Sequence, residues 1–360
     1  MVNAKTNQRG FLAIHTSDRT LFKRCRRKWD FRSTIRRNLV PTTEGPNIHL
    51  WFGTGFHFAL EDYHGYNRFG DPVKALEAYY NAFTPEQLPE GAEDIIATGM
   101  GMMDYYVQWL ERRDIYKTVW VEGVPLVEVK FQLELPPLSD EAEMPVFYRG
   151  TIDRVVEDPY GRWWVQDYKT AARIDTAKLA NDVQSAVYVW AGEQWFQREI
   201  EGMLYTQFLK DTPAQPRVNA NGSLSVNKTQ RTTHSLYKRA LDERFPSGNY
   251  PPKYIEFLNT LAERETPEGD AFIRRDELRI NEYAKENMYY NILSEGYEMI
   301  DPDLAIYPNP TRDCSWDCKE YRTACIAMEE GDDYEYMLDT FYQEEGEMDE
   351  SWRSRIKWPT

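Results

Sequence analysis

The sequence lacks any long apolar run. No segment approaches the roughly 18 apolar residues that a membrane helix needs, and residues 1–20 contain no apolar core of the kind that a secretory signal peptide has. We therefore expect no membrane segment and a cytoplasmic location. Cysteine is also scarce, with four among 360 residues. In the cytoplasm so small a set is expected to form a metal site or to stay as reduced thiols, rather than to build disulfides.

Positive charge is in deficit. Lysine and arginine number 43 against 59 aspartates and glutamates, a net charge of −16 that argues against a protein that simply coats DNA. The two ends differ, however. Arg19 to Arg37 holds nine basic residues and one acid, whereas Glu329 to Glu350 holds eleven acids and no lysine or arginine. Each stretch can be a solvated face or tail. Alternatively, the basic stretch contacts phosphates, and the acidic one contacts a protein partner or mimics DNA.

The period of the apolar residues changes along the chain. Spacing of three and four residues predicts helices at 21–39, 56–66, 72–83, 93–114 and 176–196. Strict alternation predicts a strand at 127–135, and further strands are predicted at 146–157, 163–170 and 202–210. The polar segment 211–234 is predicted to be an exposed or lid-like insertion, and 235–298 to be helical with breaks at its prolines. The order predicts an α/β fold with a mixed sheet flanked by helices.

The strand at 127–135 alternates most regularly. Its pattern predicts a half-buried strand whose apolar residues share one face. The predicted buried face is Val127, Val129, Phe131 and Leu133, and the predicted solvent face is Glu128, Lys130, Gln132 and Glu134.

Two carboxylates and a lysine lie on the next two strands. Asp167 and Lys169 are two residues apart, so they project from the same face of one strand, and a hairpin brings Asp153 alongside. Neighbouring carboxylates repel unless a cation lies between them. Oxygen ligands of this kind suit Mg²⁺ or Mn²⁺, which can polarise a phosphate and activate water. The alternative is a surface hairpin with a cross-strand ion pair.

This arrangement resembles the core of the PD-(D/E)XK nucleases, and more narrowly their RecB-like branch. That branch carries Q-x-x-x-Y on the following helix, which here reads Gln184 to Tyr188. It also carries a histidine on an upstream helix, here His57 after Gly53-Thr54-Gly55. Ile152 stands where the name of the family has proline. The resemblance implies the catalytic residues Asp153, Asp167, Lys169, Gln184 and Tyr188, and the metal ligands His57, Asp153, Asp167 and the backbone carbonyl of Tyr168.

The four cysteines fit one pattern. Cys25 lies far upstream of Cys314-x3-Cys318-x6-Cys325. A distant cysteine joined to a downstream trio resembles the iron–sulfur nucleases, which include bacterial recombination subunits, CRISPR-associated exonucleases and phage relatives. The resemblance implies a [4Fe–4S] cluster, although four thiolates suit Zn²⁺ equally. Such a cluster would be structural and would join the two ends of the chain.

The domain organisation follows from these motifs. We expect one RecB-like nuclease domain at 1–330, whose catalytic core is about 118–210. Its iron–sulfur subdomain would combine about 16–40 with 301–328, and 331–360 would be an acidic tail.

The expected function is that of a metal-dependent DNA nuclease. By resemblance it would be an exonuclease acting on ends or single strands in recombination, repair or phage replication, inside a bacterium or a phage-infected cell. A helicase or recombination protein could be its partner, and it could form a homo-oligomer. Two alternatives remain: a non-catalytic DNA-binding or assembly module with the same fold, and a four-cysteine zinc scaffold. The residues expected to contact DNA phosphates are Arg24, Arg26, Arg27 and Lys28.

Overall fold

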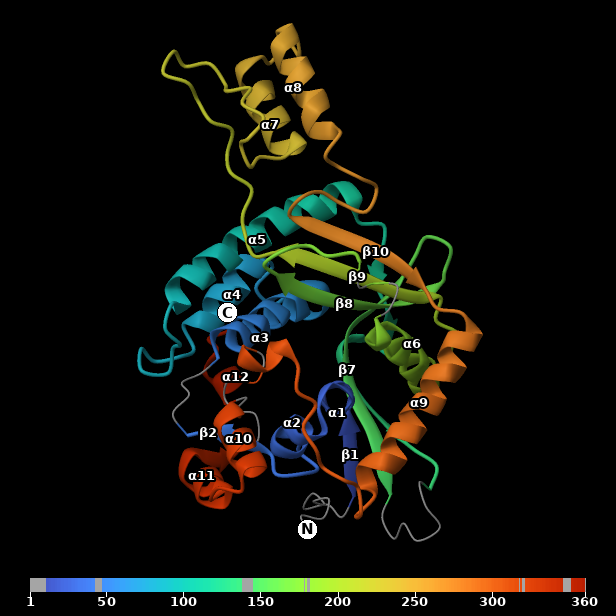
Figure 1. The fold of residues 1–360 in the computed structure, drawn as a ribbon. Coiled ribbons are helices and arrows are strands. Elements are labelled where there is room, and N and C mark those ends of the chain that lie inside the picture. Colours follow the sequence, from blue (N-terminus) through green and yellow to red (C-terminus); the bar gives the residue numbers. More distant parts are fainter. Residues whose placement is uncertain are drawn as a thin grey trace.

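The computed structural model describes residues 11–42, 47–137, 145–177, 179, 182–316, 318, 321–345 and 351–359. At its centre lies a mixed β-sheet with helices on both faces (Figure 1). The predicted α/β class, with a mixed sheet flanked by helices, is therefore confirmed.

The main sheet has the strand order β1-β7-β8-β9-β10, and β3 and β6 also pair with β7. Strands β8 and β9 run parallel, because helix α6 carries the chain back across the sheet between them. The strands of this sheet are β1 (Leu12–His15), β3 (Lys117–Thr118), β6 (Val127–Glu134), β7 (Val146–Glu157), β8 (Trp163–Ala171), β9 (Gly202–Leu209) and β10 (Ile273–Arg279). Two small sheets pair β4 (Trp120–Val121) with β5 (Val124–Pro125), and β2 (Leu39–Pro41) with β11 (Tyr342–Glu344).

One edge of β7 is interrupted. Its other edge pairs with β6 and then β3. The interrupted edge pairs with β1 at residues 146–149 and with β8 at residues 154–157. Between these two ladders, no described strand pairs with residues 150–153 on this edge. A strand has only two edges, so the sheet opens here, and Asp153 lies at one side of the opening.

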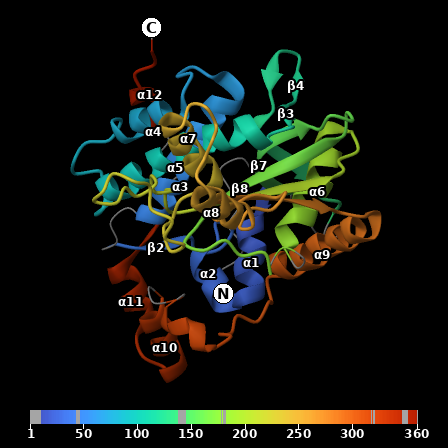
Figure 2. The same ribbon diagram turned by 90° about the horizontal axis from the view of Figure 1, so that it is seen from above.

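Each face of the sheet has its own helices and its own core. Helices α6 (Val183–Phe196) and α9 (Glu282–Ile300) cover one face, and Figure 2 shows them on one side of the sheet with α3, α4 and α5 on the other. Val165 belongs to the core under α6, whereas Tyr168 belongs to the opposite core, as strand alternation requires. The second face is covered by α3 (Ile48–Glu61), the π-helical turn η1 (Asp62–Tyr66), α4 (Pro72–Tyr80) and α5 (Ala92–Arg113).

The two ends of the chain pack together. Phe31 stacks on Tyr321, and β2 pairs with β11. The segment predicted as an acidic tail contains helix α11 and strand β11, and Trp352 of α12 is buried against Tyr79. The elements of this region are α1 (Thr16–Arg24), α2 (Arg26–Arg32), the 3-10 turn η3 (Arg312–Ser315), α10 (Arg322–Glu330), α11 (Tyr334–Phe341) and α12 (Trp352–Arg355). The domain boundary at residue 330 stays a prediction.

A small lobe is inserted between β9 and β10. It contains α7 (His234–Arg244) and α8 (Pro252–Ala262), and it projects away from the sheet at the top of Figure 1. Its apolar side chains, which include Tyr237 and Phe257, form a core cluster of their own.

Two predicted elements are corrected by the structure. The helix predicted at 21–39 breaks at Cys25, whose backbone is extended, with φ −167° and ψ 117°. The region 235–298, predicted to be helical apart from its prolines, contains strand β10. Its alternation was hidden because Arg275 occupies a buried position, where it pairs with Asp114 at 2.6 Å.

No helix in the described part of the chain is long and apolar enough to cross a membrane.

Candidate active site

The carboxylates and the lysine of the D-x-K motif meet at the opening in the sheet. The β7–β8 ladder ends at the pair Arg154 and Gln166. Just beyond it, Asp153 Oδ2 accepts a hydrogen bond of 2.7 Å from the backbone N–H of Tyr168. Lys169 Nζ donates to Asp167 Oδ1 at 2.8 Å. The Asp153 carboxylate therefore accepts the hydrogen bond that a backbone carbonyl of β7 would accept if the ladder continued, and this bond fixes the side chain of Asp153 beside β8.

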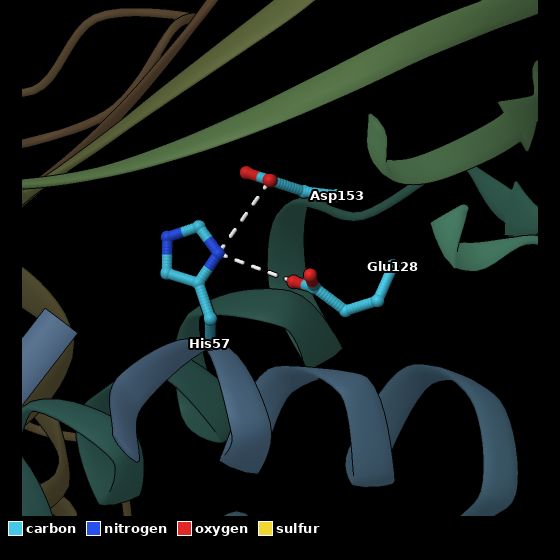
Figure 3. A group of neighbouring side chains, drawn as sticks. All are labelled: His57, Glu128 and Asp153. Atoms are coloured by element: carbon cyan, nitrogen blue, oxygen red, sulfur yellow. Dashed lines mark hydrogen bonds and ion pairs between the residues drawn. The ribbon is translucent and has the colours of Figure 1, made fainter. Parts of the chain in front are cut away.

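His57 reaches the same point from helix α3. Its ring nitrogen Nε2 lies 3.2 Å from the carbonyl oxygen of Tyr168. Its Nδ1 lies 3.5 Å from Asp153 Oδ1 and 3.2 Å from Glu128 Oε1 (Figure 3). The structure thus brings together His57, Asp153 and the Tyr168 carbonyl, which the sequence analysis had named from three separate segments.

Glu128 is a further member of this group that the sequence analysis missed. Alternation along β6 had placed it on the solvent face. The register pairs Val127 with Arg154 and Val129 with Ile152, so Glu128 lies opposite Asp153. Its φ of 47° is left-handed, and for a residue other than glycine this costs roughly 1–2 kcal/mol. The strand register would have revealed it, but a single sequence does not give that register.

Asp167 is the most deeply buried acid of the site. Its side chain accepts from Lys169 and, at 3.4 Å, from Gln184 Nε2, both at Oδ1. The other oxygen, Oδ2, is buried and has no hydrogen-bond partner. Burial, together with the negative charge of Asp153, raises the pKa of Asp167 to about 6. An unpartnered buried carboxylate oxygen next to a second carboxylate is what a cation would satisfy.

The charged residues next to Asp167 shift one another's pKa values toward their ionised forms. Burial alone would raise the pKa of Asp153, but the charges of His57 and Lys169 lower it overall. Burial would lower the pKa of His57, and Asp153 and Glu128 raise it well above its usual value. In the same way, Asp167 and Asp153 outweigh burial and raise the pKa of Lys169. The site therefore concentrates negative charge that two cationic side chains only partly balance.

The donor set fits a divalent cation. His57, Glu128 and Asp153 each offer one ligand atom, and these atoms lie within 4.8 Å of one another. Carboxylate and carbonyl oxygens with one imidazole suit Mg²⁺ or Mn²⁺. Asp167 Oδ2 adds a buried oxygen that lacks a partner.

Helix α6 brings Gln184 and Tyr188 to the edge of the site. Asp182 caps this helix by accepting from the backbone N–H of Gln184. Burial raises the pKa of Tyr188 to about 12, so its hydroxyl stays protonated near neutral pH. Both residues line a cavity of about 610 Å³ at the opening in the sheet. The other residues that line it are His15, Thr16, Ser17, Thr20, Leu21, Lys28, Arg32, Arg149, Gly150 and Tyr321.

The four cysteines line a second cavity, of about 290 Å³, between α2, the segment around Pro308 and α10. Two of the sulfur atoms accept backbone N–H groups: Cys25 from Asn309 at 3.3 Å, and Cys314 from Thr311 at 3.4 Å. The N–H of Thr311 lowers the pKa of Cys314, whereas burial raises that of Cys325. The four cysteines are nevertheless not tightly clustered, because no three of their sulfur atoms lie within 4.8 Å of one another.

The arginines expected to contact DNA have partners within the chain. Arg24 donates to Thr311 at 2.8 Å, Arg26 pairs with Glu298, and Arg27 pairs with Glu329 at 3.0 Å. Lys28 lines both cavities. DNA contact by these four residues stays a prediction, and for the arginines phosphates would have to compete with their present partners.

Comparison with protein families decides the relationship. The family model of the PD-(D/E)XK nuclease superfamily matches residues 16–325. The chain belongs to the PD-(D/E)XK nuclease superfamily. A search of curated proteins found no match. Membership in this superfamily indicates a metal-dependent nuclease that hydrolyses phosphodiester bonds, with DNA as the implied substrate. The group of His57, Glu128 and Asp153 could hold the divalent metal ion that such an enzyme uses.

Proposed function

We propose that the chain is a Mg²⁺- or Mn²⁺-dependent deoxyribonuclease of the RecB-like type, and that it acts as an exonuclease on DNA ends or single strands. One observation carries the proposal: Asp153, Asp167, Lys169 and His57 converge at the opening of the sheet, where Asp167 Oδ2 is buried without a partner. The resemblance of the motifs to RecB-like exonucleases supports the finer assignment.

The side chains divide the chemistry between them. Asp153, Asp167, His57, Glu128 and the Tyr168 carbonyl would hold the cation, which when bound polarises the phosphodiester and lowers the pKa of a bound water. Lys169 is fixed by its hydrogen bond to Asp167, so its ammonium can position the attacking water and stabilise negative charge on the phosphate.

Substrate would enter along the cavity beside α6. Lys28, Arg32 and Arg149 line this cavity together with hydroxyl groups of α1. Cationic and hydroxyl groups of this kind contact the sugar-phosphate backbone without reading sequence. The cavity also includes Gln184 and Tyr188, so a strand lying in it would pass Gln184, which donates a hydrogen bond to Asp167.

End-labelled single- and double-stranded DNA provides the test. The protein, purified anaerobically, is incubated with Mg²⁺ or Mn²⁺, and Asp167→Ala is compared with Asp104→Ala, an exposed aspartate of α5. We expect metal-dependent cleavage that Asp167→Ala abolishes and Asp104→Ala retains, with a product ladder that gives the polarity. Tight DNA binding without cleavage by the intact wild type would favour the non-catalytic module instead.

We also propose that Cys25, Cys314, Cys318 and Cys325 hold a [4Fe–4S] cluster. A single zinc ion, with Zn–S bonds of about 2.3 Å, would bring its four sulfur atoms to about 3.8 Å from one another. The wider spacing of these cysteines around one cavity fits a larger group better, because each thiolate of a cluster binds a different iron. The backbone N–H groups on Cys25 and Cys314 are of the kind that tunes cluster potentials.

Metal analysis separates the two metals. We expect a brown protein with iron and acid-labile sulfide, both lost in Cys318→Ser and kept in Ser315→Ala. A colourless protein with one tightly bound zinc would contradict the cluster. A helicase or recombination partner and a homo-oligomer stay predictions from the resemblance.

A further inference from the structure

The lobe at residues 213–264 has features that the nuclease centre does not use. It lies between β9 and β10, and its core of Leu224, Tyr237, Leu241, Tyr254, Phe257, Leu258 and Leu261 is separate from the two cores of the sheet. It projects from the rest of the molecule in Figure 1. The lobe therefore has a hydrophobic core of its own, and the polar and charged side chains on its surface can contact a ligand.

The charge of this lobe is opposite to that of the chain. Residues 213–264 contain eight lysines and arginines and four acids, a net charge of +4, in a chain whose net charge is −16. Residues 212–241 contain no acid at all, although 59 of the 360 residues are acidic. The same stretch is rich in asparagine, glutamine, serine and threonine. Together with lysine and arginine, these side chains make most contacts to nucleic-acid phosphates.

Several of these cations are available to a ligand. Among the residues that the structure describes, neither Arg217 nor Lys228 pairs with an acid, and both are exposed. Arg231 pairs with Asp211 at 2.6 Å, but both side chains are largely open to solvent. A surface pair of this kind is worth little and can exchange for a phosphate.

A cavity of about 170 Å³ lies where the lobe meets the sheet, at the start of α7. Lys228, Arg231, His234 and Arg264 line it, and so do Thr232 and Glu265. Thr232 is 6% exposed, and its Oγ1 has no hydrogen-bond partner. Glu265 Oε1 is also buried and also has no hydrogen-bond partner. Buried polar atoms are rarely left unpaired in a folded protein. An occupant of this cavity must therefore offer a hydrogen-bond donor to Glu265 Oε1, while the hydroxyl of Thr232 can either donate to it or accept from it.

The acids of the cavity are already engaged on their other sides. Glu265 Oε2 pairs with Arg113 at 2.6 Å, and Asp270 accepts from the hydroxyl of Tyr105 at 2.6 Å. A simple inorganic anion would satisfy Thr232 and the cations but leave Glu265 Oε1 unpaired. A nucleotide meets all of these needs, because its phosphate and base carry acceptors and its base carries N–H donors.

We propose that the 213–264 lobe is a second nucleic-acid-binding surface. It contacts the strand at a distance from the metal centre, and the cavity at the start of α7 binds one nucleotide. The proposal rests on the proposed function for the identity of the substrate as DNA. A nuclease with two separated contacts would retain long strands better than short ones.

Binding measured without divalent metal, by fluorescence anisotropy in EDTA over a range of salt, tests the proposal. Single strands of about 8 and about 40 nucleotides are compared, the shorter lying within the site size of one groove. The variant is Arg217→Gln/Lys228→Gln/Arg264→Gln, and the charge-matched control is Lys74→Gln/Lys117→Gln/Lys357→Gln. We expect at least tenfold weaker binding of the long strand by the first variant, and a salt slope smaller by about 2, at about 0.7 per phosphate contact. Binding of the short strand should be unchanged.

A single-atom change examines the cavity itself. Thr232→Val removes a buried unpaired hydroxyl at constant shape, so it should raise the Tm while it weakens binding of the long strand. A raised Tm with unchanged binding of the long strand would overturn the role of the cavity. Equal losses in the triple variant and its control would overturn the role of the lobe. These measurements need no cleavage. A protein that binds DNA but does not cleave it would therefore contradict the proposed nuclease function, whereas the role of the lobe would still be tested by the binding data.

Discussion

Lys169 is held by the buried carboxylate of Asp167, and in the proposed mechanism its ammonium stabilises negative charge on the phosphate. Lys169→Ala should lower the cleavage rate by about 10²–10³-fold, the usual effect of losing one preorganised charge at a developing anion. DNA binding without metal should change little, since the cavity keeps Lys28, Arg32 and Arg149. Lys117→Ala, an exposed lysine of β3, serves as the control. A loss of binding equal to the loss of rate would mean that Lys169 only binds substrate.

Glu128 is a residue at which function and stability are opposed. Its left-handed backbone suits glycine, so Glu128→Gly should stabilise the fold by about 1 kcal/mol, measured by thermal or urea unfolding. The same change removes a proposed metal ligand beside His57 and Asp153. We expect the Mg²⁺ concentration for half-maximal cleavage to rise about 10–100-fold. Glu134→Gly, on the same strand, should only destabilise. An unaltered metal requirement in Glu128→Gly would remove Glu128 from the metal site.

Glu345, which directly follows β11, lies against Arg32 of the cavity beside α6. The pairing of β11 with β2 places Glu345 against Arg32, with hydrogen bonds of 2.6 and 3.0 Å to the guanidinium. Because Arg32 lines the cavity beside Gln184, this carboxylate occupies a position that a phosphate could take.

Glu345→Gln should therefore tighten single-strand binding by about 3–10-fold and steepen its salt dependence by about 0.7, the value for one further phosphate contact. Anisotropy titrations against Glu335→Gln, an exposed acid of α11, make the comparison. Equal affinities would show that the acidic segment is structural at this position.

Segments far apart in the sequence hold the molecule together: β2 pairs with β11, and Phe31 stacks on Tyr321. The cysteine cavity joins Cys25 near one end to Cys325 near the other, so a bound cluster would close a loop that contains the whole nuclease core. Removing the cluster by oxidation and chelation should lower the Tm by several degrees, because a cross-link that closes so long a loop contributes about 5–6 kcal/mol in the chain-entropy model. Calorimetry before and after removal measures the effect. An unchanged Tm would mean that β2–β11 and Phe31–Tyr321 close the molecule without help.

The sequence predicted most of the core strands: β6 from the alternation of its apolar residues, and β8 and β9, which are buried on both faces, as short apolar runs. The bounds of β7 and β8 agree closely with the predicted 146–157 and 163–170. Strand β10 could not be predicted in this way, since its buried positions include Arg275, whose charge is paired with Asp114 of a distant segment.

That Asp167 and Lys169 share one face of a strand, and Gln184 and Tyr188 one face of a helix, could be inferred from the sequence, because local backbone geometry sets these spacings. Long-range packing, in contrast, leaves part of one edge of β7 open between β1 and β8, brings Glu128 to His57 there, and places the lobe at 213–264 away from the sheet. Strand register and the packing of distant segments depend on contacts across the whole chain, and no local pattern encodes them.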